Sequence, residues 1–396
     1  MKKLLAVFLS LILALALCGC NIMEAAEMLG GKFSLTEIET VEEYYIVSPE
    51  YNACYNSLNK QQKSIYKILY SAALQMPDGF FRLCKSYDGI KTDIAIAYNA
   101  VINDHVEIFW MPQVYLVSEM GFLARETVVC FNNPDGDKKV SYTVSKEQRS
   151  VMEKALEEEV EEILQNAKIY NTEYQKEKYF NDYICENTEY DKEAPLGHTV
   201  FGALVSGKAL CEGYAKAFKL LCNKADIECD LIVGEAEDVG HMWNSVNIDG
   251  KHSFVDVTWN DQENERYTYF NITGEQLTFD HTLLPVFKEI EDENALKTGD
   301  YNFFERECSY IGNSYFVKEA RYLSDNSYHK IASEAIKQDA LNKRESVFML
   351  SADQKEAFLK DDMGYIAKIQ NELSGIILEK YAFERDILVL FFSVLA

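Results

Sequence analysis

The sequence predicts an α+β protein, in which helical segments and paired strands occupy separate stretches of the chain. Apolar residues recur with helical spacing in Gln61–Leu74 and again in Val151–Leu164. Asp249-Gly250, by contrast, is a two-residue turn of the kind that joins antiparallel strands. The chain has 396 residues, of which 48% are hydrophobic and 26% charged. This composition is typical of a globular protein with two or three domains of roughly 100–200 residues each.

The first twenty residues differ from the rest of the chain. Lys2 and Lys3 precede an apolar run from Leu4 to Leu17. The run is shorter than the about 20 residues of a membrane-spanning helix, but it suits the apolar region of a signal peptide. It ends in Leu17-Cys18-Gly19-Cys20, which resembles a bacterial lipobox.

This ending predicts an exported lipoprotein. Cleavage before Cys20 removes residues 1–19 as a signal peptide and exposes a thiol for lipidation, with residues 20–34 as a tether. We expect a lipid anchor at Cys20, of the palmitate type, to hold the protein on the outer face of the membrane of a Gram-positive bacterium. The alternative is an ordinary secretory signal whose two cysteines are incidental.

The charge of the chain excludes some partners. The formal net charge is −25, and loss of Lys2 and Lys3 with the signal peptide leaves 37 basic against 64 acidic residues, or −27. Nucleic acid and anionic lipid would both be repelled, which leaves the lipid anchor as the membrane contact. Neither a phosphate-cradling glycine loop nor a cluster with metal-ligand spacing is visible, so no cofactor and no metal are implied.

Cysteine usage points to free thiols. Eight cysteines follow Cys20, and none of them forms a CxxC pair. A chain of this length can bury a core without disulfide bonds, so we expect mostly reduced, buried cysteines.

The residues before the central region predict a mostly helical domain over 35–135. The helix in Gln61–Leu74 is followed by a further helical stretch at Ile94–Ile102. A β-hairpin is expected where Thr127–Phe131 and Val140–Val144 flank the turn sequence Asn133-Pro-Asp-Gly136.

A second domain is expected over 136–290. Its first helix runs from a capping box at Ser145 and Gln148 to about Ala167, and a second runs from Thr172 to about Cys185.

Residues 300–396 predict a small α/β add-on domain of short strands and helices. The expected strands are Tyr301–Val317, Val347–Leu350, Ile376–Tyr381 and Ile387–Val394, and the expected helices are Lys318–Lys337 and Ser351–Ser374.

The segment Gly207-Lys-Ala-Leu-Cys211 leads into a helix. Cys211, Ala215, Phe218 and Cys222 fall on one helical stripe, which places Cys211 in the first turn. A helix N-terminus offers unpaired N–H groups and about half a positive charge, and both stabilise a thiolate. The same N–H groups can hold an oxyanion.

The turn at Asp249-Gly250 sets the register of a hairpin. If Ile248 pairs with Lys251, then Trp243 faces Asp256, and His241 faces Thr258. Side chains alternate along strands, so His241 and Asp256 become diagonal neighbours on one face, about 7 Å apart at the backbone. The turn chemistry therefore predicts a histidine–carboxylate pair.

Such a pair activates a thiol when it lies beside one. Asp256 would orient the imidazole, and His241 would exchange a proton with Cys211. Each residue alone has a plainer explanation: a helix cysteine is usually part of a core, a strand histidine is usually structural, and Asp256 could cap a neighbouring backbone group.

Three blocks together resemble the transglutaminase-like superfamily. They are Gly202-Ala-Leu…Gly207-Lys-Ala-Leu-Cys211-Glu-Gly-Tyr-Ala-Lys-Ala-Phe, then His241-Met-Trp-Asn-Ser-Val, then Phe254-Val-Asp256-Val-Thr-Trp. The resemblance covers about residues 140–275, and Tyr269–Thr273 and His281 resemble the segment that comes after this core in bacterial members. It implies a papain-like core, in which a helix carrying the cysteine packs on an antiparallel sheet carrying the histidine and aspartate. It also implies that Cys211, His241 and Asp256 are the catalytic residues.

The second oxyanion donor of the family, often Gln or Trp upstream of the cysteine, has no match between Tyr190 and Cys211. His198 lies in that stretch as a candidate, although a structural or surface role is the simpler interpretation. Trp243 is interpreted as a wall of the substrate pocket, and Trp259 as core.

The resemblance implies a thiol acyl-transfer enzyme, and the signal peptide expected at residues 1–19 implies that it acts outside the cell. Hydrolysis of protein or cell-wall peptide through a Cys211 thioester is the favoured hypothesis. The alternatives are a protein-crosslinking transglutaminase, a non-catalytic surface-binding module, and a structural envelope protein whose flanking domains do the work.

Overall fold

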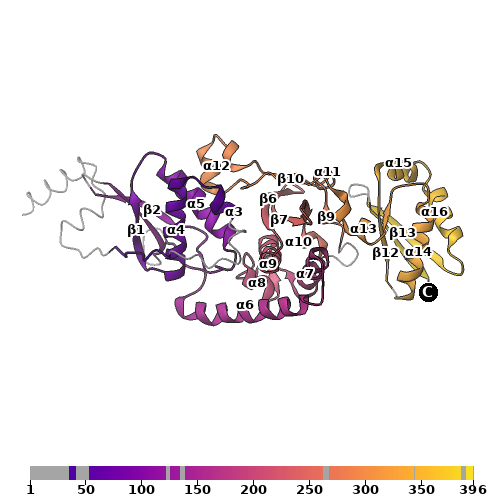
Figure 1. Cartoon of the computed structure of the whole chain (residues 1–396), viewed down its shortest axis with the longest axis horizontal. Coiled ribbons are helices and arrows are strands. Elements are labelled where there is room, and N and C mark those ends of the chain that lie inside the picture. Colours follow the sequence, from indigo (N-terminus) through magenta and orange to yellow (C-terminus); the bar gives the residue numbers. More distant parts are fainter. Residues whose placement is uncertain are drawn as a thin grey trace, which may run out of the picture. The chain divides into compact units, whose positions relative to one another are not determined.

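A computed structural model describes residues 35–41, 53–121, 125–133, 139–261, 267–342, 344–384 and 389–395 (Figure 1). The expected signal peptide, Cys20, the tether and the turn residues 134–136 lie outside these ranges. The chain forms two compact units. One comprises Met1–Lys154 with Glu289–Asp300, and the other comprises Ala155–Lys288 with Tyr301–Ala396.

The first unit combines helices with a small sheet. Its helices are α3 (Ala53–Ser57), α4 (Lys60–Gln75), α5 (Ile90–Asp104) and α12 (Glu293–Thr298). Its strands are β1 (Gly79–Lys85), β2 (Leu116–Met120) and β3 (Glu126–Asn132), in the antiparallel order β1-β3-β2. The predicted helices in α4 and α5 are confirmed. The region is less purely helical than expected, because the sheet supplies part of its core.

The prediction of a β-hairpin around residue 134 was wrong. Strand β3 forms as expected, but it lies at the centre of its sheet, paired with β1 on one edge and β2 on the other. Residues 140–144 therefore find no free edge to join. What remains is a hydrogen bond in which the Asn133 N–H donates to the Val140 carbonyl, at 2.8 Å.

Two capped helices precede the central sheet in the sequence. Helix α6 (Lys146–Ala167) begins with the predicted capping box of Ser145 and Gln148. Helix α7 (Glu173–Asn187) is capped by Thr172, whose hydroxyl accepts from the Gln175 N–H. Both predicted starts are confirmed, because these polar side chains satisfy the free N–H groups of the first turn.

A five-stranded antiparallel sheet organises the second unit, in the order β10-β6-β7-β8-β9. Its strands are β6 (Cys229–Ala236), β7 (Val239–Ile248), β8 (Lys251–Val255), β9 (Phe270–Ile272) and β10 (His281–Leu283). Helix α9 (Cys211–Lys224) packs on β6 and β7, and α7, α8 (Val200–Leu204) and α10 (Val257–Asn260) pack on α9. The short strands β4 (Glu189–Tyr190) and β5 (Lys208–Ala209) pair in parallel before α9.

The β7–β8 hairpin has the predicted register from Ile248↔Lys251 to Asn244↔Val255. Its turn has φ of 52° at Asp249 and 76° at Gly250, the left-handed conformation that a two-residue hairpin turn requires. The register ends there. The expected pairings of Trp243 and His241 with residues of an extended β8 were wrong, because the chain leaves the sheet after Val255 and turns into α10.

The C-terminal region is the expected α/β addition. A four-stranded sheet has the order β11 (Tyr322–Leu323), β12 (Ser346–Leu350), β14 (Val389–Leu395) and β13 (Ile377–Glu384). The helices are α14 (Tyr328–Leu341), α15 (Ala352–Lys360) and α16 (Asp362–Glu372). The single helix expected over 351–374 is broken, because Asp361 leaves the helical conformation and caps α16.

Strands were also expected in residues 301–317, where the structure has mainly non-strand conformations. These residues form the 3-10 helix η3 (Ile311–Asn313) and the short helix α13 (Tyr315–Lys318). The connecting elements before them are α11 (Gly274–Leu277) and the 3-10 helix η2 (Phe287–Glu289).

One apolar cluster joins this C-terminal sheet to the central sheet. Met349 and Val389 from the former pack together with Trp243, Phe254 and Ile272 from the latter. The C-terminal sheet therefore supports the strands that carry the site. Within the described residues, no helix is both long and apolar enough to cross a membrane.

Candidate active site

Cys211 is the first residue of α9, as the apolar stripe predicted. Two contacts fix the start of this helix. The Leu210 N–H donates to the Gly197 carbonyl at 2.9 Å. A Cβ at Gly213 would lie 2.4 Å from the same carbonyl oxygen, so only glycine allows this close approach. The half-buried Cys211 thiol therefore lies beside the free N–H groups of a helix N-terminus.

His241 and Asp256 meet at the end of the central sheet. His241 Nε2 donates to Asp256 Oδ2 at 2.6 Å. Asp256 is the N-cap of α10, and its Oδ1 accepts from the Trp259 N–H at 3.1 Å. The predicted pair thus forms by a different route: the carboxylate is held by a helix cap and not by a paired strand.

The pair is strongly polarised. Burial disfavours the charged imidazole of His241, but the Asp256 carboxylate outweighs burial and, with a hydrogen bond to the Cys211 sulfur, raises the pKa of His241 to about 10. Burial opposes ionisation of Asp256 too. The imidazoles of His241 and His281 outweigh it and lower the pKa of Asp256 to about 2. The arrangement therefore favours an imidazolium beside a sulfur and a carboxylate.

An open pocket of about 350 Å³ brings Cys211 and His241 together. Its lining residues are Tyr190, Cys211, Ala236, Glu237, Val239, Gly240, His241, Thr258, Trp259 and Asp261. Asp256 lies behind His241 with a fully buried side chain. A thiol, an imidazole and a buried carboxylate are thus arranged in sequence from the pocket to the core.

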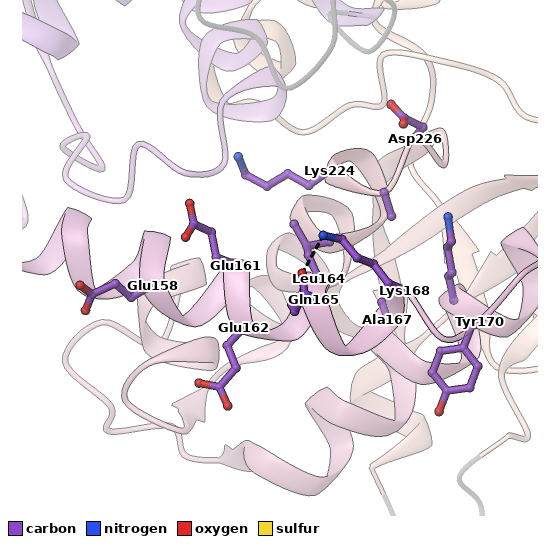
Figure 2. A pocket seen from close by; sticks show the side chains of 12 residues that line it. Glu158, Glu161, Glu162, Leu164, Gln165, Ala167, Lys168, Tyr170, Lys224 and Asp226 are labelled. Carbon is purple, nitrogen blue, oxygen red and sulfur yellow. Dashed lines mark hydrogen bonds between the residues drawn. The ribbon is translucent and has the colours of Figure 1, made fainter.

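A larger hollow of about 860 Å³ lies over the end of α6, the start of α7 and the end of α9. Figure 2 shows its mixed charges, with Glu158, Glu161 and Glu162 on α6 and Lys224 on α9, and with Lys168 bonded to Gln165. Among the described residues that line it there is no cysteine or histidine. We therefore place the chemistry in the smaller pocket, where the reactive groups converge.

The structure exchanges the two expected roles of Trp243 and Trp259. Trp243 is 1% exposed and packs beneath His241, so it is core and not a pocket wall. Trp259 is only partly buried and lines the pocket. The exchange follows from α10, which turns Trp259 toward the pocket after the strand ends.

His198 is not among the residues that line the pocket. Its Nδ1 bonds to Glu212 Oε2 at 2.9 Å, and Lys216 bonds to the same glutamate. The hydrogen bond to Glu212 raises the pKa of His198. These contacts make His198 part of a surface ion-pair network, the simpler of its two expected roles.

Tyr190 was missed by the sequence analysis and lies beside the cysteine. It ends β4 and pairs with Ala209, two residues before Cys211. Burial, followed by the nearby Cys211 sulfur, raises the pKa of Tyr190, so its hydroxyl keeps its proton. No local pattern marks this tyrosine, because its position depends on a parallel pairing between segments about nineteen residues apart.

A second histidine also reaches the site. His281 Nε2 donates to Asp256 Oδ2 at 3.1 Å, and its side chain is fully buried. The ligand atoms of His241, Asp256 and His281 lie within 4.8 Å of one another, a grouping that could hold a metal ion. Both imidazoles already bond to one carboxylate oxygen, so an ion would have to replace these hydrogen bonds.

Part of the chain is similar to known proteins. Residues 161–259 match the transglutaminase-like superfamily. The Kyphoscoliosis peptidases of Mus musculus and Homo sapiens are each 28% identical over 121 residues, which are 26% of this chain and 18% of theirs. The matched part is thus under a fifth of the length of these relatives.

Two solved structures are similar to part of the chain. The crystal structure of a TGase covers 36% of this chain and 43% of its own, at 18% identity and a TM-score of 0.26. A candidate cysteine protease from Cytophaga hutchinsonii covers 37% and 63%, at 14% identity and a TM-score of 0.24. From the family match over residues 161–259, we conclude that this chain contains a domain of the transglutaminase-like superfamily.

Proposed function

We propose that this protein is a thiol acyl-transfer enzyme that cleaves amide bonds in protein or cell-wall peptide. The observation that carries the proposal is the placement of Cys211 at the start of α9, within reach of His241, whose imidazole is tied to the buried Asp256. Cys211 is then the nucleophile, His241 the general acid and base, and Asp256 the group that orients the imidazole.

The reaction proceeds in two halves. The Cys211 thiolate attacks the carbonyl carbon and forms a C–S bond. His241 then protonates the leaving nitrogen as the C–N bond breaks, which leaves a thioester and a neutral imidazole. In the second half His241 takes a proton from water, the resulting hydroxide attacks the thioester, and the acid and the Cys211 thiolate are released.

The developing oxyanion needs donors near the sulfur. We assign the N–H groups in the first turn of α9 and the hydroxyl of Tyr190, which replaces His198 as the side-chain donor. Removing this hydroxyl in Tyr190→Phe is expected to lower kcat about 100-fold with little change in fold. Mass-spectrometric turnover of a peptide library checks this, and an unchanged kcat would remove Tyr190 from the mechanism.

The pocket favours substrates with a positive charge near the cleaved bond. Glu237 and Asp261 are, besides His241, the charged residues among its described lining. Both are acidic, and they would attract a lysine or another amine. We expect peptides with lysine beside the cleaved bond to react faster than glutamate peptides. Glu237→Gln should reduce that preference.

Water and amines compete for the same thioester. We favour hydrolysis, while the acidic lining also suits a lysine amine, which would make the protein a crosslinking transglutaminase (a glutamine γ-glutamyltransferase). Incubation with a glutamine-rich protein and a biotinylated primary amine distinguishes the two. Incorporated biotin that disappears in Cys211→Ala supports crosslinking, whereas chain cleavage or deamidation alone supports hydrolysis.

We further propose that the protein acts outside the cell, anchored by lipid at Cys20. The basic start, apolar run and lipobox-like ending at Cys20 support this location. Metabolic labelling with an alkyne fatty acid is expected to mark the wild type and not Cys20→Ala, and Cys20→Ala should leave the membrane fraction. Equal labelling of the two proteins would contradict the anchor.

A further inference from the structure

The carboxylate of Asp256 has more partners than a cysteine–histidine–aspartate site requires. Oδ2 accepts from His241 Nε2 and from His281 Nε2, at 2.6 and 3.1 Å, and Oδ1 accepts from the Trp259 N–H. His281 does not line the pocket. Its contact with Asp256 therefore acts on the reaction only through the carboxylate.

His281 is itself held from its other side. Its Nδ1 donates to Asp280 Oδ1 at 2.5 Å, and Asp280 Oδ2 accepts from the Tyr269 hydroxyl at 2.6 Å. Both ring nitrogens of His281 thus face a carboxylate oxygen. With both carboxylates ionised, each bond needs a donor from the ring, and His281 is then the doubly protonated, positively charged imidazolium.

The surroundings leave His281 little freedom to turn. Its side chain is fully buried, and its ring packs between Trp259, at 4.7 Å, and Trp243, at 5.0 Å between ring centroids. Its backbone is the first residue of β10, paired with Ala236 of β6. A single charged imidazole is therefore locked between two carboxylates inside the apolar core.

This arrangement has an electrostatic reason. Asp256 is buried and must remain ionised to favour the His241 imidazolium. The Trp259 N–H holds only Oδ1, and a carboxylate can turn about its last side-chain bond, which would misalign the His241 ring. The fixed His281 Nε2 holds Oδ2 against this rotation, and Asp280 balances the added positive charge.

We propose that His281 is a positioning residue, held by Asp280 and Tyr269, that fixes the Asp256 carboxylate so that Asp256 aligns His241 toward Cys211. The proposal rests on the proposed function, since it assigns the support of that same site. Successive contacts link Cys211, His241, Asp256, His281, Asp280 and Tyr269, and the most deeply buried side chains, Asp256 and His281, lie in the middle.

Two variants of similar size separate positioning from packing. His281→Gln keeps an amide donor where Nε2 stood, whereas His281→Leu fills the space without any donor. A purely structural role predicts that both variants behave alike per folded molecule. A positioning role predicts that His281→Gln retains most of the wild-type reactivity of Cys211 and that His281→Leu does not.

The readout is the alkylation of Cys211 by iodoacetamide in the full chain. The rate is followed by mass spectrometry of the Cys211 peptide between about pH 5 and pH 9, so that no substrate is needed. At about pH 6 we expect His281→Leu to slow alkylation by about 10- to 100-fold, because misplacement of about 1 Å has effects of this size. Its pH profile should move toward that of an ordinary thiol. His281→Gln should stay close to the wild type.

Three controls assign the outcome. His252→Gln changes a partly buried histidine of β8, which bonds to Ser245, and should leave the rate unchanged. The thermal midpoint of each variant measures folding. If His281→Leu does not fold, Asp280→Leu removes the carboxylate that holds His281 Nδ1 and should also slow alkylation.

The failures of the two proposals differ. A wild-type Cys211 that reacts no faster than the other thiols at about pH 6 would overturn the proposed function. A reactive Cys211 that depends on His241 but is unaffected by a folded His281→Leu, or by Asp280→Leu in its place, would overturn the positioning role alone. Equal slowing by His281→Leu and His281→Gln would also overturn it, because it would point to packing.

Discussion

Two carboxylates of the second unit are equally buried and have opposite character. Asp256 is 1% exposed, and the pKa of its carboxyl is lowered to about 2. Glu177, on α7, is 0% exposed, and burial raises its pKa to about 8. Burial disfavours the charged form in both. The difference must therefore lie in their partners.

The partners are of different kinds. Asp256 accepts from two imidazoles and one backbone N–H. Glu177 Oε2 accepts from the neutral amide of Asn271 at 2.8 Å, while Glu177 Oε1 and Asn271 Oδ1 have no hydrogen-bond partner when Glu177 is taken as ionised. A proton on Oε1 could satisfy both of these atoms, which agrees with a neutral carboxylic acid paired with an amide. Asp256 is thus held in its charged form by imidazole donors, whereas Glu177 is offered only a neutral amide.

The largest expected effect comes from removing the charge of Asp256. Asp256→Asn retains an N-cap for α10, since Asn is a good capping residue, but it no longer favours the His241 imidazolium. We expect Cys211-dependent turnover to fall by about 10⁴-fold, as for the aspartate of a serine-protease triad. The matched control is Glu177→Gln, which should leave turnover unchanged. Similar losses in both variants would abolish the distinction between the two acids.

The next effect is a loss of stability as pH rises from about 4.5 to about 8. The folded-state pKa of Glu177 is raised from 4.5 to about 8. The contribution of Glu177 to the free energy of unfolding is therefore fully present below about pH 4.5 and is lost as pH rises to about 8. The loss is on the order of a few kcal/mol, because each pKa unit corresponds to about 1.4 kcal/mol. Glu177→Gln stays neutral and should keep its stability over this range.

The measurement is urea unfolding at about pH 5 and pH 9 for wild type and Glu177→Gln. His241, whose pKa is also raised, loses its contribution as pH rises from 6.5 to about 10 in both proteins, so the difference between them isolates Glu177. If the free energy of unfolding depends on pH in the same way in the two proteins, Glu177 is ionised in the folded protein.

Asp256 has the opposite dependence. Its folded-state pKa is lowered from 3.8 to about 2, so its stabilisation is present above about pH 3.8 and is lost as pH falls to about 2. The expected loss is about 2 kcal/mol. Unfolding free energies of wild type and Asp256→Asn should therefore converge between about pH 4 and pH 2, and a constant difference would contradict the assignment.

The smallest expected effect tests the amide partner of Glu177. Asn271 has φ of 57°, so Asn271→Gly removes the amide without straining the backbone. The acid then loses its hydrogen bond, and the free energy of unfolding should fall by about 1–3 kcal/mol while Cys211 alkylation is unchanged. A change in alkylation would mean that the two acids are coupled.

Much of the site could be predicted from short segments. The stripe of Cys211, Ala215 and Phe218 predicted the helix that begins at Cys211, because a helical face is a local pattern. Asp249-Gly250 predicted the register of β7 and β8, because the turn geometry decides which residues pair. Both inferences use neighbours within a few residues.

The errors share one cause. Local pattern cannot tell where a strand stops or which edge it meets. The hairpin near residue 134 failed because β1 and β2 occupy both edges of β3. Trp243 and Trp259 exchanged roles because Asp256 caps a helical turn instead of extending β8.

By itself, the sequence determined the helix that starts at Cys211, the hairpin that carries His241, and the residue types that a thiol acyl-transfer site needs. Only the tertiary structure decided that Tyr190 lies beside the sulfur and that His281 supports Asp256 from behind. Helical periodicity and turn chemistry act over a few residues and can be read along the chain. Strand pairing across long loops and the burial of charge depend on the whole packed unit, which no short segment encodes.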